Sequence, residues 1–292
     1  MSGIWVAVSF LAVSTAVFLY ALQWLLKRTR RGRDPVNKGE LMLRQAGEGL
    51  RDKIDAKKDE FVDEVINGMF VPVVVALVPG TVLYVFRAST WTPWLAGLVG
   101  VGFLISFALR LRRATGLLEE IRNLRLGLVG ERLVAGKLEE LAVKGYHVYH
   151  DAQAQGAKEK FNIDHLVVGR TGVYVVETKM RRKPEGKDSY KVEYNGSGLV
   201  WPAGVETDST QQVCHNARWL QDHLRTKLGL DLEVKPLLVI PGWFVTMPTR
   251  GAVMAVNHKQ LEGAMSGPAV LDARTVDLVR RQLEALCRDV PT

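Results

Sequence analysis

The sequence has few cysteines: Cys214 and Cys287 are the only two among 292 residues. Two cysteines cannot form a disulfide framework, and their spacing is not that of metal ligands, so we expect the globular part of the chain to occupy a reducing compartment. With 27 glycines, 11 prolines and 47% apolar residues, the composition excludes both a collagen-like chain and a disordered one. The sequence also contains no internal repeat and no low-complexity segment.

Charged residues are almost absent from two stretches, residues 4–26 and 66–109, and dense in the rest of the chain. The mean hydropathy of +0.02 is therefore an average over apolar stretches and a charge-rich remainder. This distribution argues against an entirely soluble protein, while the roughly 200 residues outside the apolar stretches can bury the core of one globular domain. The net charge of +8 permits an anionic partner, either nucleic acid or lipid headgroups.

The apolar stretches predict three transmembrane helices, at residues 4–26, 66–86 and 91–109. Each is close to the length of about 20 helical residues that a bilayer core requires. A cleaved signal peptide is the alternative for the first stretch, but no positive charge precedes it and no small-residue cleavage site follows it. We therefore expect a multi-pass protein of the cell membrane, with the lipid bilayer as a partner.

Basic residues near the ends of the predicted spans indicate the orientation, because lysine and arginine are retained on the cytoplasmic side. Five basic residues follow the first span and three follow the third, whereas the loop between the second and third contains only Arg87. The amino terminus is therefore expected outside and the carboxyl-terminal domain in the cytoplasm. The predicted parts are an anchor at residues 1–34, an amphipathic cytoplasmic helix at 35–65, a transmembrane hairpin at 66–113 and a globular domain at 114–292.

The globular domain alternates between helical and strand periodicity, which is typical of the α/β class with a mixed sheet. Residues rich in β-branched and aromatic side chains predict strands, and amphipathic stretches predict helices between and after them. The expected strands are 146–150, 162–168, 173–176, 234–240 and 252–257, and the expected helices are 117–140, 210–228 and 273–287.

A tight turn at residues 169–172 predicts a hairpin in which Gly169 faces Gly172. That register places Asp164 opposite Glu177, and Lys179 projects from the same face as Glu177 because side chains alternate along a strand. His165 then lies on the opposite face, which favours a packed or hydrogen-bonded histidine over a metal ligand. The flanking strands are apolar on both faces, so the hairpin is expected to be covered on both sides.

Two opposed carboxylates in a covered sheet are destabilising unless something offsets their repulsion. A divalent cation bound by both would do so, because hard oxygen ligands suit Mg²⁺ or Mn²⁺. Lys179 could then orient the attacking water during hydrolysis of a phosphate ester. The alternative is an outward-facing, solvated pair in which Lys179 neutralises one carboxylate.

Four ordered motifs resemble the nuclease-related domain, NERD, a branch of the restriction-endonuclease-like PD-(D/E)xK superfamily. They are Gly127-Leu-Val-Gly-Glu131, Asn162-Ile-Asp-His165, Gly172-Val-Tyr-Val-Val-Glu-Thr-Lys179 and a helix that carries glutamines, and together they span residues 126–225. The resemblance implies a restriction-endonuclease-like mixed sheet flanked by helices and a metal-dependent nuclease. It also implies that Glu131, Asp164 and Glu177 bind the metal, that Lys179 is catalytic and that a helix glutamine supports them.

The glutamine is either Gln211 or Gln212, and we prefer Gln212 because Ala217 and Leu220 then take the apolar positions of the family helix. Four basic residues follow the predicted Glu-x-Lys strand and could contact a nucleic-acid backbone: Arg181, Arg182, Lys183 and Lys187. A solvated basic loop is the alternative reading. Two functions stay open: a Mg²⁺-dependent or Mn²⁺-dependent nuclease acting on DNA or RNA at the cytoplasmic face, and an inactive module that binds nucleic acid or protein.

Overall fold

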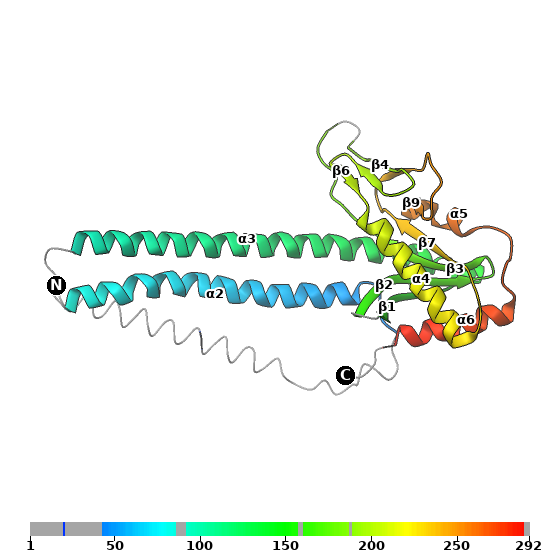
Figure 1. Cartoon of the computed structure of the whole chain (residues 1–292), viewed down its shortest axis with the longest axis horizontal. Coiled ribbons are helices and arrows are strands. Elements are labelled where there is room, and N and C mark those ends of the chain that lie inside the picture. Colours follow the sequence, from blue (N-terminus) through cyan, green and yellow to red (C-terminus); the bar gives the residue numbers. More distant parts are fainter. Residues whose placement is uncertain (1–19, 21–42, 86–91, 157–159, 187–188, 289–292) are drawn as a thin grey trace. The chain divides into compact units, whose positions relative to one another are not determined.

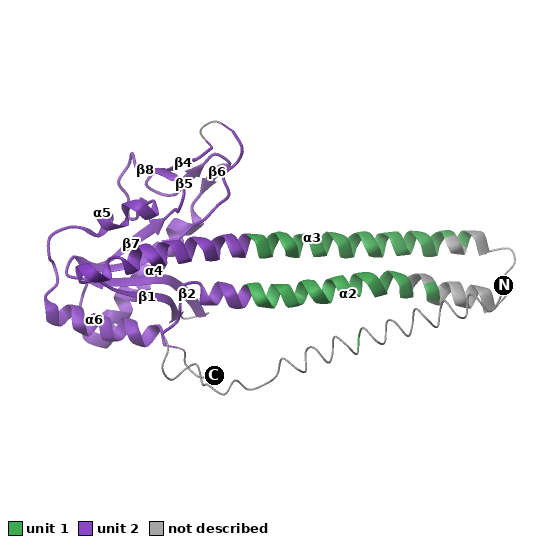
Figure 2. Ribbon diagram, turned by 180° about the vertical axis from the view of Figure 1, so that it is seen from behind, with its two compact units in different colours: residues 1–36, 54–122 green, residues 37–53, 123–292 purple. Residues whose placement is uncertain are grey.

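The computed structural model describes residues 20, 43–85, 92–156, 160–186 and 189–288. The chain divides into two compact units (Figure 2). Met1–Val36 and Ile54–Arg122 form the first unit, and Asn37–Lys53 and Asn123–Thr292 form the second.

Two long helices run through the chain, α2 (Glu48–Val85) and α3 (Thr92–Glu139). Within the first unit, ion pairs join them: Arg110 Nη1 lies 3.1 Å from Glu64 Oε1, and Arg113 Nη2 lies 3.3 Å from Glu60 Oε1. Glu64 is only 5% exposed, so Arg110 is the main compensation for a buried carboxylate. The arginines that the sequence presents as markers of membrane orientation thus pair across the two helices.

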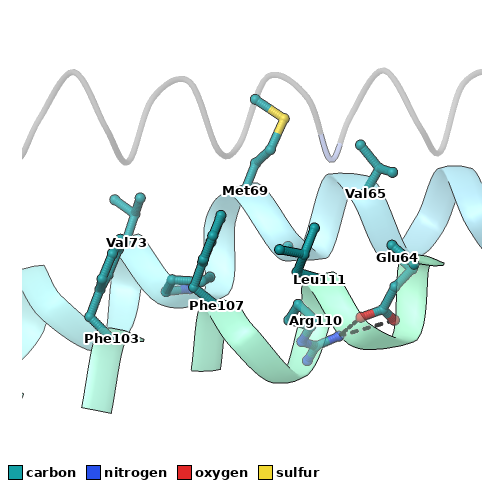
Figure 3. A pocket seen from close by; sticks show the side chains of 11 residues that line it. Glu64, Val65, Met69, Val73, Phe103, Phe107, Arg110 and Leu111 are labelled. Atoms are coloured by element: carbon teal, nitrogen blue, oxygen red, sulfur yellow. Dashed lines mark hydrogen bonds and ion pairs between the residues drawn. The ribbon is translucent and has the colours of Figure 1, made fainter. Parts of the chain in front are cut away.

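An apolar groove of about 370 Å³ lies beside this ion pair (Figure 3). Val65, Met69, Phe103 and Phe107 line it, and the two phenylalanine rings stack with their centroids 6.3 Å apart. The groove shows that the apolar side chains of the two helices leave space between them instead of filling a closed core.

Over the part of the chain that the structure describes, no helix carries an apolar stretch long enough to cross a membrane. The expected spans at residues 66–86 and 91–109 are therefore not supported. The expected span at residues 4–26 lies, apart from Tyr20, outside the described residues.

The second unit is built around a five-stranded sheet of order β1-β2-β3-β7-β9 (Figure 1). Strands β1, β2 and β3 are antiparallel to one another, and β7 and β9 continue the sheet parallel to β3. The strands are β1 (His147–Gln155), β2 (Lys160–Gly169), β3 (Gly172–Thr178), β7 (Val234–Val239) and β9 (Met254–Val256). The predicted α/β class with a mixed sheet is confirmed.

Helices cover both faces of this sheet, as its apolar residues require. On one face, Leu166, Val175 and Leu238 pack against α4 (Asp208–Leu228) and α6 (Ala273–Leu286). On the other face, Val167, Val176 and Leu237 pack against the end of α3 and against α5 (Leu261–Met265). Two short 3₁₀ helices, η1 (Ala142–Lys144) and η2 (His258–Gln260), complete the helical elements of the unit.

A second sheet of order β6-β5-β4-β8 was not expected from the sequence. Its strands are β4 (Lys191–Tyr194), β5 (Leu199–Trp201), β6 (Gly204–Glu206) and β8 (Phe244–Thr246). Each has three or four residues, which is too short for an alternating pattern to stand out in the sequence.

The hairpin register agrees with the prediction, because Gly169 pairs with Gly172 and His165 pairs with Val176. The paired ladder ends there, one position before Asp164 and Glu177. Every residue of β3 from Gly172 to Glu177 is buried, which confirms that the hairpin is covered on both sides.

The turn of this hairpin yields a stability prediction. A methyl group on Gly169 would lie 2.5 Å from Cδ1 of Tyr146, and hydrogen bonds from Tyr146 Oη to Thr171 Oγ1 and the Met265 carbonyl hold that ring in place. We expect Gly169→Ala to lower the free energy of unfolding by about 1–3 kcal/mol through overpacking.

The matched control is Gly136→Ala, because a methyl group there meets nothing within 4 Å on an exposed turn of α3. It should stabilise the protein by about 1 kcal/mol through helix propensity. Chemical denaturation of the two variants measures both effects, and equal stabilities would contradict the close contact with Tyr146.

Candidate functional site

Acidic residues meet at the point where the paired ladders of β1, β2 and β3 are interrupted. His150 pairs with His165 and Ala152 pairs with Ile163, which leaves Asp151 and Asp164 at opposed positions without a ladder pair. Continuing the β2–β3 register by one step sets Glu177 on the other side of Asp164. We call Asp151, Asp164 and Glu177 the carboxylate row, since they occupy neighbouring positions across three strands.

Uncharged hydrogen-bond donors bind the carboxyl groups of Asp164 and Glu177. The backbone N–H of Thr178 donates to Asp164 Oδ2 over 2.8 Å. Gln212 Nε2 donates to Glu177 Oε1 over 2.6 Å, and Asn216 Nδ2 donates to Glu177 Oε2 over 3.3 Å. Gln212 and Asn216 lie four residues apart on α4 and therefore on one helix face. Glu177 thus has both of its oxygens occupied.

The third acidic residue of the sequence motifs, Glu131, comes from α3 and is 7% exposed. Burial raises the pKa of Glu131 to about 9, and repulsion from Asp164 and Asp151 adds to the effect. Burial likewise raises the pKa of Asp164 to about 7, although the Thr178 N–H and Lys179 oppose this shift. The pKa of Glu177 is raised well above its ordinary value by burial and by the charges of Asp164 and Glu131. The structure therefore brings these three carboxyl groups into mutual electrostatic contact.

Lys179 follows β3, and its backbone N–H donates to the Val239 carbonyl over 2.8 Å. Its positive charge lowers the pKa of both Asp164 and Glu177, so it lies beside the carboxylate row. The Glu-x-Lys spacing of β3 produces this arrangement, because residues two apart project from one face of a strand.

The basic side chains that follow β3 make separate contacts. The Arg181 guanidinium stacks 4.8 Å above the ring of Trp201 and lies 3.7 Å from Glu206 Oε2. Arg182 donates to Asn123 Oδ1 over 3.0 Å, and Lys183 is exposed. Lys187 lies outside the described residues.

His165 is buried on the opposite side of β2 from Asp164, as the alternation predicts. Its Nδ1 lies 2.9 Å from His150 Nδ1, and its Nε2 lies 3.3 Å from Thr178 Oγ1. Burial lowers the pKa of His165 well below its ordinary value, so the ring is neutral. It is a hydrogen-bonded core histidine behind the site.

Two functional-site residues escaped the sequence reasoning. Asp151 is 4% exposed and has a left-handed backbone with φ of 49°, which is uncommon for a residue other than glycine. It accepts hydrogen bonds from Arg44 Nε over 3.0 Å and from Asn162 Nδ2 over 2.9 Å. The other residue is Asn216, 1% exposed. An aspartate at the predicted end of a strand was the only available signal for Asp151.

The donor chemistry fits a hard divalent cation, because adjacent buried carboxyl groups with raised pKa values would gain from a shared positive charge. Within the described residues, however, no three His, Cys, Asp or Glu side chains are grouped closely enough to hold a metal ion. The metal-binding role of Glu131, Asp164 and Glu177 stays a prediction. Asp164 and Glu177, which adjoin each other in register, are the residues that would hold a cation.

The raised pKa of Glu131 predicts a pH dependence of stability in EDTA. Between pH 7 and 9 the folded protein keeps a proton on Glu131 that the unfolded chain has released, so the folded state loses stability as pH rises. One such proton corresponds to about 1 kcal/mol per pH unit.

Thermal melting at pH 7, 8 and 9 measures this slope. We expect Glu131→Gln to reduce it, and we expect Glu140→Gln, which changes an exposed glutamate paired with Lys137, to keep the wild-type slope. A wild-type melting temperature that rises over this window would contradict the buried, protonated Glu131.

Comparisons with known proteins agree with the geometry. Residues 126–241 match the family NERD, described as the nuclease-related domain. The match covers less than half of the chain and extends beyond the region that the motifs indicated, to two residues past the end of β7.

A curated protein of Bacillus anthracis, described as uncharacterized, is 43% identical over 54 residues. That alignment covers 18% of this chain and 26% of the relative. No solved structure matches the chain. The predicted family is therefore confirmed for part of the chain: a nuclease-related domain is present at residues 126–241.

Proposed function

We propose that the domain at residues 126–241 is a nuclease that hydrolyses phosphodiester bonds of DNA or RNA with Mg²⁺ or Mn²⁺ as its cofactor. The observation that supports this most directly is the buried pair of Asp164 and Glu177 with Lys179 beside it. Repelling carboxylates in a covered sheet destabilise the fold, so a compensating role in binding is the physical reason to keep them.

In this proposal each residue of the site has a separate role. Thr178, Gln212 and Asn216 hold the carboxylates of Asp164 and Glu177 in fixed orientations through their hydrogen bonds. Lys179 orients the attacking water and takes part in removing its proton. Glu131 contributes a further carboxyl group whose protonation responds to the charge of Asp164. A bound cation would supply stabilisation of the charge that grows on the phosphate.

Arg181, Arg182 and Lys183 extend the proposal to nucleic-acid binding, because they follow the site directly in the chain. Arg182 and Lys183 are both exposed. Arg181 would first have to leave Trp201 and Glu206. Lys187 keeps its predicted place in this group.

A non-catalytic module that binds nucleic acid or protein is the second candidate. The observation that favours it is the lack, within the described residues, of a three-residue group that could hold a metal. Both oxygens of Glu177 are also occupied by amide donors. These contacts must rearrange before Glu177 can ligate a cation.

Cleavage assays with the full chain distinguish the two candidates. Labelled single-stranded and double-stranded DNA and RNA are incubated with Mg²⁺, Mn²⁺ or EDTA, and the melting temperature is followed in parallel. Asp164→Asn should abolish both cleavage and the cation-dependent rise in melting temperature, because it removes a cation-binding oxygen.

Lys179→Met should retain the cation-dependent rise and nucleic-acid binding, and lose turnover by about 10²–10⁴-fold, as expected for a group that acts in proton transfer. Lys227→Met, an exposed lysine in the last turn of α4, is the control and should behave as wild type. Wild-type protein that neither cuts any of these substrates nor melts higher with either cation would leave the binding module as the function.

The membrane location is part of the same proposal: three spans, with the amino terminus outside and the α/β unit in the cytoplasm. Its support is the near absence of charge from residues 4–26, 66–86 and 91–109, together with exposed Leu98, Leu104 and Leu109 on α3. Such an apolar surface needs a lipid or protein partner.

Cell fractionation tests this location. We expect the chain to stay in the membrane pellet after alkaline carbonate extraction, and we expect a reporter fused to the carboxyl terminus to signal from the cytoplasm. Release into the supernatant, or an external signal from that fusion, would overturn the membrane location or its orientation.

A further inference from the structure

A segment far upstream of residues 126–241 belongs to the same compact unit as the carboxylate row. Residues 43–53 lie within Asn37–Lys53, which clusters with Asn123–Thr292. Leu43 forms a β-bridge with Arg288, and the Arg44 N–H donates to the Cys287 carbonyl over 2.8 Å. The start of α2 is thus fixed to the α/β unit by the backbone.

Asp151 is the second anchor of this segment. Arg44 Nε donates to the Asp151 carbonyl over 3.1 Å and to its carboxylate, and the Gly49 N–H donates to Asp151 Oδ2 over 2.7 Å. A Cβ atom on Gly49 would lie 2.5 Å from Asn162 Nδ2, so a side chain there would displace the Asn162 amide from Asp151. The first turn of α2 therefore lies against the carboxylate row.

The same turn also reaches α3 beside Glu131. A Cβ atom on Gly47 would lie 3.3 Å from Glu131 Oε2, and a Cβ atom on Gly127 would lie 3.2 Å from Leu50 Cδ1. The start of α2 is thus positioned from both sides, by β1 through Asp151 and by α3 near Glu131.

Lys53 follows Gly49 by four residues, so it projects from the face of α2 that contacts Asp151. It is exposed, and no ion pair or hydrogen bond of its ammonium occurs with the described residues. Its positive charge acts on Glu131 and Asp164, whose pKa values it lowers. Lys53, which lies upstream of residues 126–241, therefore places a solvent-accessible ammonium group near the acidic site.

We infer that Lys53 binds a phosphate of the nucleic acid that occupies this site, held there by the attachment of α2 to Asp151. A lysine is a point-charge donor suited to phosphate oxygens. This inference rests on the proposed function, because it assigns the substrate chemistry to the same site. It makes the upstream segment part of the binding surface.

Binding measurements in the Lys179→Met background, with the full chain and Mg²⁺ present, test the inference without turnover. Fluorescein-labelled single-stranded and double-stranded DNA and RNA are titrated at several KCl concentrations. We expect Lys53→Met to weaken binding about tenfold, as for the loss of one charged hydrogen bond. The slope of log Kd against log salt should fall by about 1, because one fewer counterion is released.

Two variants control the interpretation. Lys53→Arg keeps the charge and should restore most of the affinity and the salt slope. Lys58→Met removes a nearby lysine of α2 that pairs with Asp55 and should leave both quantities unchanged.

The outcomes distinguish failure of the role of Lys53 from failure of the proposed function. Tight binding by the Lys179→Met parent with the same affinity and slope after Lys53→Met would overturn the role of Lys53 and leave the proposed function standing. Failure of the parent to bind any of the four nucleic acids would overturn the proposed function, and the role of Lys53 with it.

Discussion

The burial of neighbouring carboxyl groups, which repel one another when ionised, is the constraint on which the α/β unit depends. Asp151, Asp164 and Glu177 take neighbouring positions across β1, β2 and β3, and Glu131 adds a fourth acidic group from α3. Burial and mutual repulsion raise the pKa values of Glu131, Asp164 and Glu177. The fold compensates through specific donors: a backbone N–H for Asp164, two amides for Glu177 and an arginine for Asp151.

These compensating groups connect distant parts of the chain. The donors to Glu177 come from α4, and Asn216 lies on the same buried face of that helix as Val213 and Leu220, so the position of the helix and the orientation of the carboxylate are set together. The donor to Asp151 comes from residues 43–49, which makes the start of α2 a structural part of a unit that begins again only at Asn123. The compact unit that contains residues 126–241 therefore includes an upstream segment, which most of α2 and α3 separate from it in the sequence.

The part of the site on one hairpin could be predicted from the sequence. The turn at Gly169 and Gly172 defines the register, and strict alternation then relates Asp164, Glu177 and Lys179 without further information. The role of Asn216 was not predictable, because an asparagine on a helix face is ordinarily solvated and only its packing against β3 makes it a donor to Glu177. Arg44 and Asp151 are 107 residues apart in the chain, and no local periodicity relates them.

By itself, the sequence determined the α/β class, the mixed sheet, most of its strands and the nuclease-related motifs, because alternation, turn residues and apolar runs are local signals. Only the tertiary structure decided which side chains satisfy the buried charges, since those partners come from separate elements. It also decided the second sheet, whose strands are too short to carry a pattern, and the pairing of Arg110 and Arg113 with α2. The contacts of Arg44, Gln212 and Arg110 join residues far apart in the chain, where only packing relates them.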